Sequence, residues 1–312
     1  MTRILLTQND VDELGPALAE LPVTPVVLGV DDPEGIEVAW GSNAMYLGGH
    51  GRKFFGTAVH SPTLKWVQVS NAGTDDPVFA RLMANGVTLT TSHVTGPPIA
   101  EYTLRAVLDW FQRADKWRET IAERQWKGHQ FREVFGTTWL VIGLGAIGSA
   151  VAERAQSFGT HVIGVRRTPT GDEPVHELVA PADVLGVLPR ADVVVLALPF
   201  GNDTAGMVDA EFLGAMKAGS VLVNVARGPL VDEAALLAAL DAGTPDAALL
   251  DVAATEPPAD DSPLWDHPKV VLTPHSSALG FNRHERAAAF FLENLRRYLA
   301  GEPLRNVVPA AG

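Results

Sequence analysis

The run WLVIGLGAIGSAVA, residues 139–152, constrains the fold most, because it combines an apolar strand, a G-x-G-x-x-G turn at 143–148 and the start of a helix. Such glycines permit a tight turn, close approach of the backbone to a pyrophosphate, and close packing of helix on strand. The helix N-terminus adds unpaired N–H groups and a partial positive charge. The run therefore predicts a dinucleotide site, although a tight turn in a cofactor-free α/β domain has the same pattern. The candidate cofactor-binding residues of the turn are Gly143, Gly145, Ala146, Ile147 and Gly148.

The next apolar run, HVIGV at 161–165, ends in two arginines, Arg166 and Arg167. An Asp or Glu that binds the ribose hydroxyls commonly lies about 20 residues beyond the glycine turn. An arginine in its place offers a charge-assisted fork to a 2′-phosphate. The pair therefore favours NADP(H) over NAD(H). In the alternative interpretation the arginines are solvated surface charges, or they pair with Glu177 or Asp183.

The rest of the chain alternates apolar runs with helical patterns. From Thr138 onward the strands WLVIG, HVIGV, VVVLALP, SVLVNVA, AALLDVA and VVLTP are nearly all apolar, which is typical of a doubly wound parallel sheet buried on both faces. In residues 1–95 the runs RILLT, TPVVLGV, AMYLGG, KWVQVS and VTLTTS are predicted as strands of a second α/β unit. A long helical pattern, Ile99–Trp126, follows Pro97 and Pro98.

Charge and cysteine content exclude several classes of function. The 312 residues carry a formal net charge of -13, which argues against binding to nucleic acid or to an anionic membrane surface. The chain has no cysteine, which excludes disulfides, thiolate nucleophiles and Cys-ligated zinc, and no histidine spacing suggests a metal site. No apolar run approaches the about 20 residues that span a bilayer. We therefore expect a cytoplasmic protein.

Three consecutive strand ends carry charged groups. Arg227 follows SVLVNVA, Glu256 follows AALLDVA after a short loop, and His275 follows VVLTP. Ligands of open parallel sheets bind beyond the carboxyl ends of the strands. Hydride transfer to a 2-oxo acid needs an arginine for the carboxylate and ketone, an imidazolium as proton donor, and a carboxylate that stabilises the imidazolium. Taken singly, each residue has another interpretation, as helix-start charge, loop charge or buried histidine.

Four blocks of the sequence resemble the D-isomer-specific 2-hydroxyacid dehydrogenase family. NVARGPLVDEAALLAAL, LLDVAATEPPADDSPLW and VVLTPHSSA are similar to its three signature blocks, and VIGLGAIGSAVAERAQSFGTHVIGVRR to its cofactor block. The resemblance implies Arg227, Glu256 and His275 as the catalytic triad. It implies two Rossmann-like or flavodoxin-like domains with a cleft between them: a substrate-binding domain of residues 1–96 plus 281–312, and a cofactor domain of residues 97–280. It also implies a homodimer formed through the cofactor domains.

The resemblance extends to ligand-binding residues. QVSNAGTDD stands where the family binds the substrate carboxylate through backbone amides, although Thr74 replaces a common second glycine. GVRRTP is similar to members that reduce glyoxylate and hydroxypyruvate with NADPH. The implied substrate-binding residues are Asn71, Ala72, Gly73, Arg227 and His275. The implied further cofactor-binding residues are Pro199, Ala226, Asp251 and His275.

These observations predict an NADP(H)-favouring reductase of a small 2-oxo acid, with hydroxyacid oxidation as the reverse reaction. Two alternatives stay open. One is a dinucleotide-sensing protein of the same fold without turnover. The other is a phosphoglycerate-dehydrogenase-like enzyme, which would need an extra basic residue at the substrate loop; Arg52, Lys53 or a partner subunit are candidates.

Overall fold

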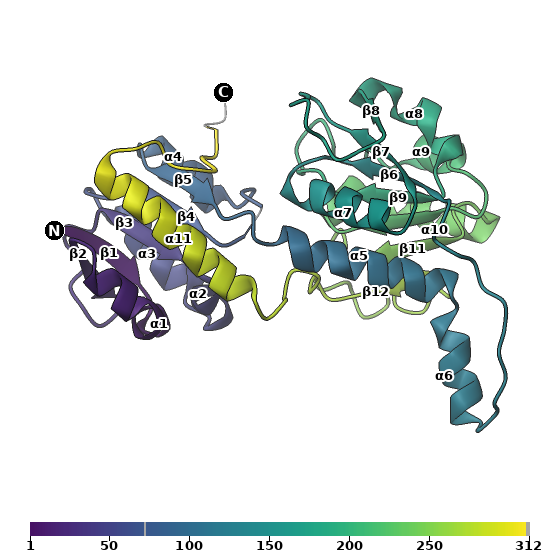
Figure 1. The fold of residues 1–312 in the computed structure, drawn as a ribbon, viewed down its shortest axis with the longest axis horizontal. Helices are drawn as coiled ribbons and strands as arrows, with labels where there is room; N and C mark the ends of the chain where they lie inside the picture. The colour runs from purple at the N-terminus through teal and green to yellow at the C-terminus, as the bar shows by residue number, and fades with distance from the viewer. Residues whose placement is uncertain (72, 310–312) are drawn as a thin grey trace. The chain divides into compact units, whose positions relative to one another are not determined.

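The computed structural model describes residues 1–71 and 73–309. Contacts between Cα atoms divide the chain into two compact units. The first unit combines Met1–Thr95 with the C-terminal segment from Gly280, and the second unit is Gly96–Leu279. In Figure 1 the first unit contains the purple and blue strands together with the yellow C-terminal helix.

The first unit is a five-stranded parallel sheet with the order β2-β1-β3-β4-β5, flanked by helices. This is the order of flavodoxin-like sheets. Its strands are β1 Thr2–Leu6, β2 Val23–Val27, β3 Val38–Gly41, β4 Trp66–Val69 and β5 Thr88–Thr91. Its helices are α1 Gln8–Ala19, α2 Asn43–Leu47, α3 Gly51–His60, α4 Pro77–Ala84 and α11 Arg283–Ala300. The helix α11 is fixed on the sheet by aromatic stacking, since Phe291 lies 4.8 Å from Trp40 and 5.6 Å from Trp66 between ring centroids.

One strand prediction in the first unit is wrong. AMYLGG was expected to form a strand, but its first residues lie in the short helix α2. The Ser42 side chain accepts a hydrogen bond from Met45 N at 3.1 Å and so caps this helix. The strand that occupies the expected position in the sheet is β3, VAWG, whose four residues are all buried. A short apolar run does not by itself distinguish a strand from a helix, and in α2 only Asn43 and Met45 are buried.

The second unit is a seven-stranded parallel sheet with the order β12-β11-β10-β9-β6-β7-β8. Its strands are β6 Thr138–Ile142, β7 His161–Val165, β8 Glu177–Val179, β9 Val193–Leu196, β10 Val221–Asn224, β11 Ala247–Leu250 and β12 Val270–Leu272. Its α-helices are α5 Gly96–Phe111, α6 Ala114–Ala122, α7 Ala146–Ser157, α8 Val184–Val187, α9 Ala210–Ala215 and α10 Glu233–Ala242. Short 3-10 turns lie at Pro181–Asp183, Leu188–Arg190 and Gly228–Leu230.

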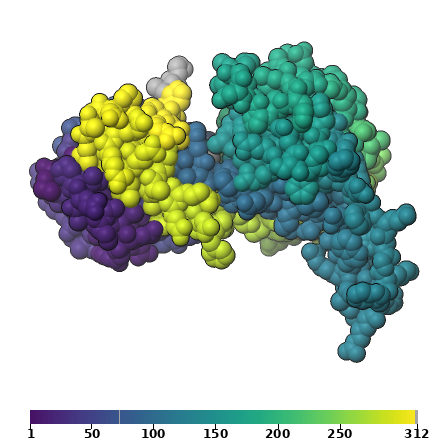
Figure 2. Space-filling model, viewed as in Figure 1, coloured from purple at the N-terminus to yellow at the C-terminus, as the bar shows by residue number. Residues whose placement is uncertain are grey.

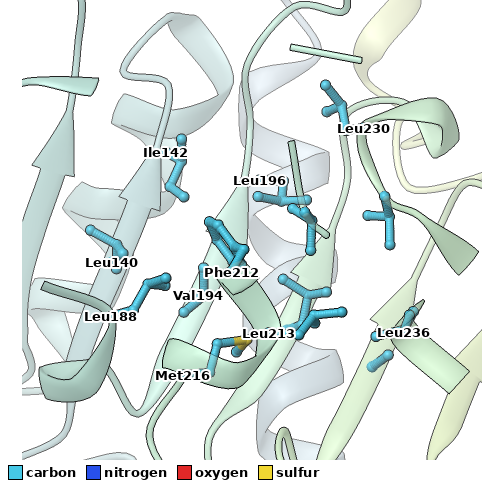
Figure 3. Packing of buried hydrophobic residues seen from close by; sticks show 14 of the residues in the cluster. Leu140, Ile142, Leu188, Val194, Leu196, Phe212, Leu213, Met216, Leu230 and Leu236 are labelled. Atoms are coloured by element: carbon cyan, nitrogen blue, oxygen red, sulfur yellow. The ribbon is translucent and has the colours of Figure 1, made fainter. Parts of the chain in front are cut away.

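Both faces of this sheet are buried, which confirms the predicted doubly wound α/β class. Along β9, Val193 and Val195 belong to a hydrophobic cluster on one face, whereas Val194 and Leu196 belong to a cluster on the other face. Figure 3 shows the second of these clusters, in which Phe212 from α9 packs over the strands. Complete burial of alternate residues on both faces explains why the strands read as continuous apolar runs.

The long helix predicted over Ile99–Trp126 is two helices. The helix α5 ends at Phe111, and α6 begins after Arg113, whose φ of 52° is left-handed. The Arg113 guanidinium donates to Asp115 at 3.0 and 3.3 Å, which stabilises the break. The helix α6 has no buried residue; it projects away from the sheet of its own unit in Figure 1 and from the rest of that unit in Figure 2. The segment predicted as one long helix therefore comprises two differently oriented helices.

Candidate active site

The three predicted catalytic residues follow neighbouring strands of the second unit. The strands β10, β11 and β12 are adjacent in the sheet, and Arg227, Glu256 and His275 come after their carboxyl ends. The turn before Arg227 is held by Asn224, whose side-chain amide donates to the Arg227 carbonyl at 2.9 Å and accepts from Ala226 N at 3.0 Å. The side chain of Arg227 donates to the Ala226 carbonyl at 2.8 Å and makes further contacts. The parallel topology thus gathers these groups at one edge of the sheet.

The side chains of His275 and Glu256 form a hydrogen-bonded pair. The distance between His275 Nδ1 and Glu256 Oε2 is 2.8 Å. The other carboxylate oxygen of Glu256 accepts from Ala253 N at 3.1 Å, so the loop after β11 holds this carboxylate in place. With Nδ1 donating to Glu256, the other ring nitrogen, Nε2, is free to exchange a proton with a ligand. The pair lines a cavity of about 320 Å³ whose other walls include Pro257, Trp265 and Leu272.

Asp251, expected near the cofactor, anchors the loop that carries His275. Its side chain is buried, and its oxygens accept from Thr273 Oγ1 at 2.7 Å, Ser276 N at 2.9 Å and Ser277 N at 3.0 Å. Its carbonyl accepts from His275 N at 2.8 Å. His275 itself has a left-handed φ of 49°, a conformation that surrounding contacts must stabilise. The sequence carried no signal for this anchoring role, because the four partners lie more than twenty positions downstream.

The glycine turn borders a second, larger cavity of about 950 Å³ in the same unit. An added Cβ at Gly148 would lie 1.8 Å from the Gly143 carbonyl oxygen, and Gly143 has a φ of +96°, so neither position accepts a side chain. At Gly145 an added Cβ would meet no atom within 4 Å. The open position is at the N-terminus of α7, which begins at Ala146. The residues therefore fit a dinucleotide whose pyrophosphate approaches the backbone at Gly145.

Arg166 and Arg167 both line this larger cavity, as does Pro199. Arg166 donates to the Leu144 carbonyl at 3.0 Å, and its side chain is 32% exposed. Arg167 is 78% exposed and lies 3.7 Å from Asp203. Neither arginine pairs with Glu177 or Asp183 among the described residues, since Glu177 binds Arg190 instead. Arg166 is thus an ordered wall residue, whereas Arg167 is a solvated rim residue.

The carboxylate of Glu173 lies near Arg166, with 3.6 Å between Glu173 Oε1 and Arg166 Nη1. Its carboxylate is already occupied by its own loop: Oε1 accepts from Thr170 N and Thr170 Oγ1, and Oε2 accepts from Gly171 N. The backbone N–H of Thr170 is the main cause that lowers the pKa of Glu173 to about 2. Because its oxygens are committed to these donors, Glu173 does not replace the acid that binds ribose hydroxyls in NAD-type sites.

The predicted substrate loop lies in the first unit, directly after β4. Asn71 Nδ2 donates to the Gly73 carbonyl at 2.7 Å, which closes the loop on itself. Tyr46 Oη donates to Asn71 Oδ1 at 2.9 Å, a contact that sequence reasoning missed because Tyr46 was placed in a strand. Burial is the main cause that raises the pKa of Tyr46, so its hydroxyl stays protonated and able to donate. Ala72, also predicted in this loop, lies outside the described residues.

Acidic and histidine side chains do not gather into a metal centre in the part of the chain that the structure describes. Within residues 1–71 and 73–309, no group of three or more His, Cys, Asp or Glu side chains is arranged to hold a metal ion. In the same residues no helix is both long and apolar enough to cross a membrane.

The family model described as "D-isomer specific 2-hydroxyacid dehydrogenase, NAD binding domain" matches residues 104–277, within the second unit. The chain belongs to this family. It is 34% identical over 218 residues to glyoxylate/hydroxypyruvate reductase A of Salmonella typhi, covering 69% of each chain. It is 35% identical over 255 residues to D-3-phosphoglycerate dehydrogenase of Mycobacterium tuberculosis, covering 81% of this chain. The match spans only 48% of that relative's length.

Among solved structures, the chain is similar to a D-isomer specific 2-hydroxyacid dehydrogenase from Xanthobacter autotrophicus in complex with NADPH and MES. The TM-score is 0.78 and the sequence identity is 30%, over 99% of this chain and 98% of that chain. The resemblance found in the sequence blocks is therefore confirmed, and so is the two-sheet fold.

Proposed function

We propose that this protein reduces a small 2-oxo acid, such as glyoxylate or hydroxypyruvate, to the D-2-hydroxy acid with NADPH, and catalyses the reverse oxidation. The observation that carries the proposal is the His275–Glu256 pair, 2.8 Å apart, in a unit that also holds a dinucleotide-sized cavity. A histidine oriented by a carboxylate, in the same unit as a cavity that fits a dinucleotide, is the set of groups that a carbonyl reductase needs.

The glycine turn at 143–148 would hold a nicotinamide dinucleotide, which when bound would supply the hydride for the reduction. Arg227 holds the substrate carboxylate and polarises its ketone through charge-assisted hydrogen bonds. His275 donates its Nε2 proton to the oxygen as negative charge develops there. Glu256, bonded to Nδ1, orients the ring and stabilises the imidazolium before this transfer. In the oxidative direction the neutral His275 accepts the hydroxyl proton, and Glu256 stabilises the resulting cation.

Three observations support NADP(H) over NAD(H). Arg166 and Arg167 line the cavity at the end of β7, where the family's cofactors carry the adenosine ribose. The carboxylate of Glu173 is bound by its own loop. A relative that is 30% identical was solved with NADPH. Together these favour a site that attracts the 2′-phosphate rather than one that binds free ribose hydroxyls.

In this proposal the first unit supplies backbone amides that bind the substrate. Backbone amides of the loop at Asn71 and Gly73 bind the substrate carboxylate, and the Tyr46 hydroxyl fixes Asn71 at 2.9 Å. The two units thus take the roles of substrate domain and cofactor domain. We also propose a homodimer formed through the second unit, because α6 has no buried residue and Trp126, on the segment after it, is 99% exposed.

The test is the rate of NADPH oxidation with glyoxylate and with hydroxypyruvate, for the wild type, His275→Ala and the control His60→Ala. His60 is exposed at the end of α3, and among the described residues its side chain bonds only to the Gly56 carbonyl. We expect turnover by the wild type and the control, and a loss of about 100- to 10,000-fold in kcat for His275→Ala with unchanged NADPH binding. Tight NADPH binding without turnover of any 2-oxo acid would instead favour a dinucleotide-sensing protein. A His275→Ala variant with wild-type kcat would remove this residue from the mechanism.

A further inference from the structure

Arg283 is a partly buried cation without an acidic partner. It is the first residue of α11 in the first unit, and among the described residues no ion pair joins it to a carboxylate. Within the part of the chain that the structure describes, its side chain makes one hydrogen bond, from Nη2 to the Ser70 carbonyl, which is long at 3.4 Å. Its Nε is buried and has no hydrogen-bond partner. A guanidinium can donate five hydrogen bonds, so most of this capacity is unused.

The local structure does not explain this cation. A positive charge at the N-terminus of a helix opposes the helix dipole, so Arg283 does not stabilise α11 electrostatically. Burial lowers the pKa of Arg283, which means that the surrounding protein destabilises the charged form. Arg297 and Arg305 form ion pairs with Glu293, whereas Arg286, also on α11, donates to the Val94 carbonyl at 3.3 Å. Burial and the helix dipole both disfavour a guanidinium at this position. A ligand with a negative charge would offset both costs.

The unused donors are at the predicted substrate loop. Ser70, whose carbonyl Arg283 contacts, immediately precedes Asn71. Tyr46 bonds to Asn71 at 2.9 Å, and the positive charge of Arg283 partly opposes the rise in the pKa of the Tyr46 hydroxyl. All four residues belong to the first unit. Arg283 lies 213 positions after Ser70 in the chain, so the sequence of the loop does not reveal that this cation is near it.

We propose that Arg283 binds a second anionic group of the substrate, so that the preferred substrate is a 2-oxo acid with a distal carboxylate or phosphate. This inference rests on the proposed function, since it assigns the substrate class of the same site. The backbone amides of the loop take the 2-oxo carboxylate, and the Arg283 fork takes the second oxyanion. The extra basic residue required for a phosphorylated hydroxyacid is therefore supplied by α11. Arg52 and Lys53 are exposed, and the Lys53 side chain lies against Gly29 instead.

The experiment compares kcat/KM for glyoxylate, which has no distal group, with kcat/KM for oxaloacetate, 2-oxoglutarate and 3-phosphohydroxypyruvate. The variants are Arg283→Gln, Arg283→Lys and the control Arg296→Gln, which removes the same charge from an exposed position on α11. We expect at least one dianionic substrate to exceed glyoxylate by about 10-fold or more in the wild type. Arg283→Gln should lower kcat/KM for that substrate by about 10- to 100-fold and for glyoxylate by less than about threefold. Arg283→Lys should recover part of the loss, and Arg296→Gln should change nothing.

The best dianionic substrate distinguishes a distal carboxylate from a distal phosphate. A wild type that prefers glyoxylate to all three dianions overturns the inference, and so does an equal loss for every substrate in Arg283→Gln. Glyoxylate turnover by the wild type tests the proposed function separately. If no acid is reduced, the Kd of 2-oxoglutarate, measured by calorimetry, tests the anion site without turnover. Weaker binding to Arg283→Gln than to the wild type supports the site, and equal binding overturns it.

Discussion

Replacing Arg166 with alanine should lower kcat/KM for NADPH far more than replacing Arg167. The difference follows from how the two side chains are held. Arg166 is 32% exposed, and its Nη1 is fixed by the Leu144 carbonyl at 3.0 Å. Arg167 is 78% exposed and has only a 3.7 Å contact with Asp203. An ordered guanidinium loses less conformational freedom when it binds a phosphate and is less screened by water.

The magnitudes follow from these environments. A charge-assisted hydrogen bond from a partly buried group contributes about 1.5–3 kcal/mol, which corresponds to a loss of about 10- to 150-fold for Arg166→Ala. A solvated ion pair contributes about 0–1 kcal/mol, so Arg167→Ala should cost no more than about fivefold. Asp203→Asn should change kcat/KM for NADPH in the opposite direction, by up to about threefold, because it removes a negative charge beside Arg167.

The assay is the initial rate of cofactor oxidation with saturating 2-oxo acid, measured with NADPH and with NADH for each variant. NADH lacks the 2′-phosphate, so its kcat/KM should stay within about twofold of the wild type. Arg190→Ala, which breaks the Arg190–Glu177 pair outside the cavity, is the control for a general change of charge. Equal losses with NADPH and NADH in Arg166→Ala would show a structural role, through the lost Leu144 contact, and would refute the phosphate assignment.

Three further predictions concern residues of the second unit. Glu256→Gln should lower kcat by about 10- to 100-fold with little change in the KM for NADPH, because the ring of the proton donor loses its charged partner; a normal kcat by steady-state kinetics would contradict this. Gly148→Ala should lower the free energy of unfolding by more than about 2 kcal/mol in denaturant titration, because the added Cβ overlaps a backbone oxygen. Gly145→Ala, where the added Cβ meets no atom, should leave the stability near that of the wild type and raise the Kd of NADPH. The pKa of Glu173 is lowered from 4.5 to about 2, so its stabilising effect is complete above pH 4.5 and is lost as the pH falls toward 2. The difference in Tm between the wild type and Glu173→Gln should therefore narrow as the pH falls from 6 to 3, and a constant difference would contradict the hydrogen-bond assignment.

The sequence was most informative where chemistry depends on local geometry. The spacing of Gly143, Gly145 and Gly148 predicts a strand, a tight turn and a helix in that order, and no other simple local structure fits it. Parallel strands share a direction, so residues after successive strands gather at one edge, and this rule alone predicts that Glu256 and His275 lie in the same region. Their 2.8 Å contact follows from that topology together with the short loops that carry them.

The features missed by the sequence analysis depend on contacts between distant positions. Asp251 was assigned only to the cofactor, although its carboxylate holds the Thr273–Ser277 loop. Arg283 contacts the substrate loop only because α11 returns to the first unit. The division of the predicted long helix at Arg113 arises from a single left-handed residue, which periodicity does not reveal.

The most direct test of the proposed reaction is product analysis after reduction of hydroxypyruvate with NADPH that carries deuterium at the nicotinamide C4 position. Chiral chromatography with mass spectrometry then reports the configuration and the isotope at C2 of the glycerate. Direct hydride transfer in a D-isomer-specific site predicts D-glycerate with one deuterium at C2. An L or racemic product, or D-glycerate without deuterium from either C4 position of the cofactor, would contradict the account.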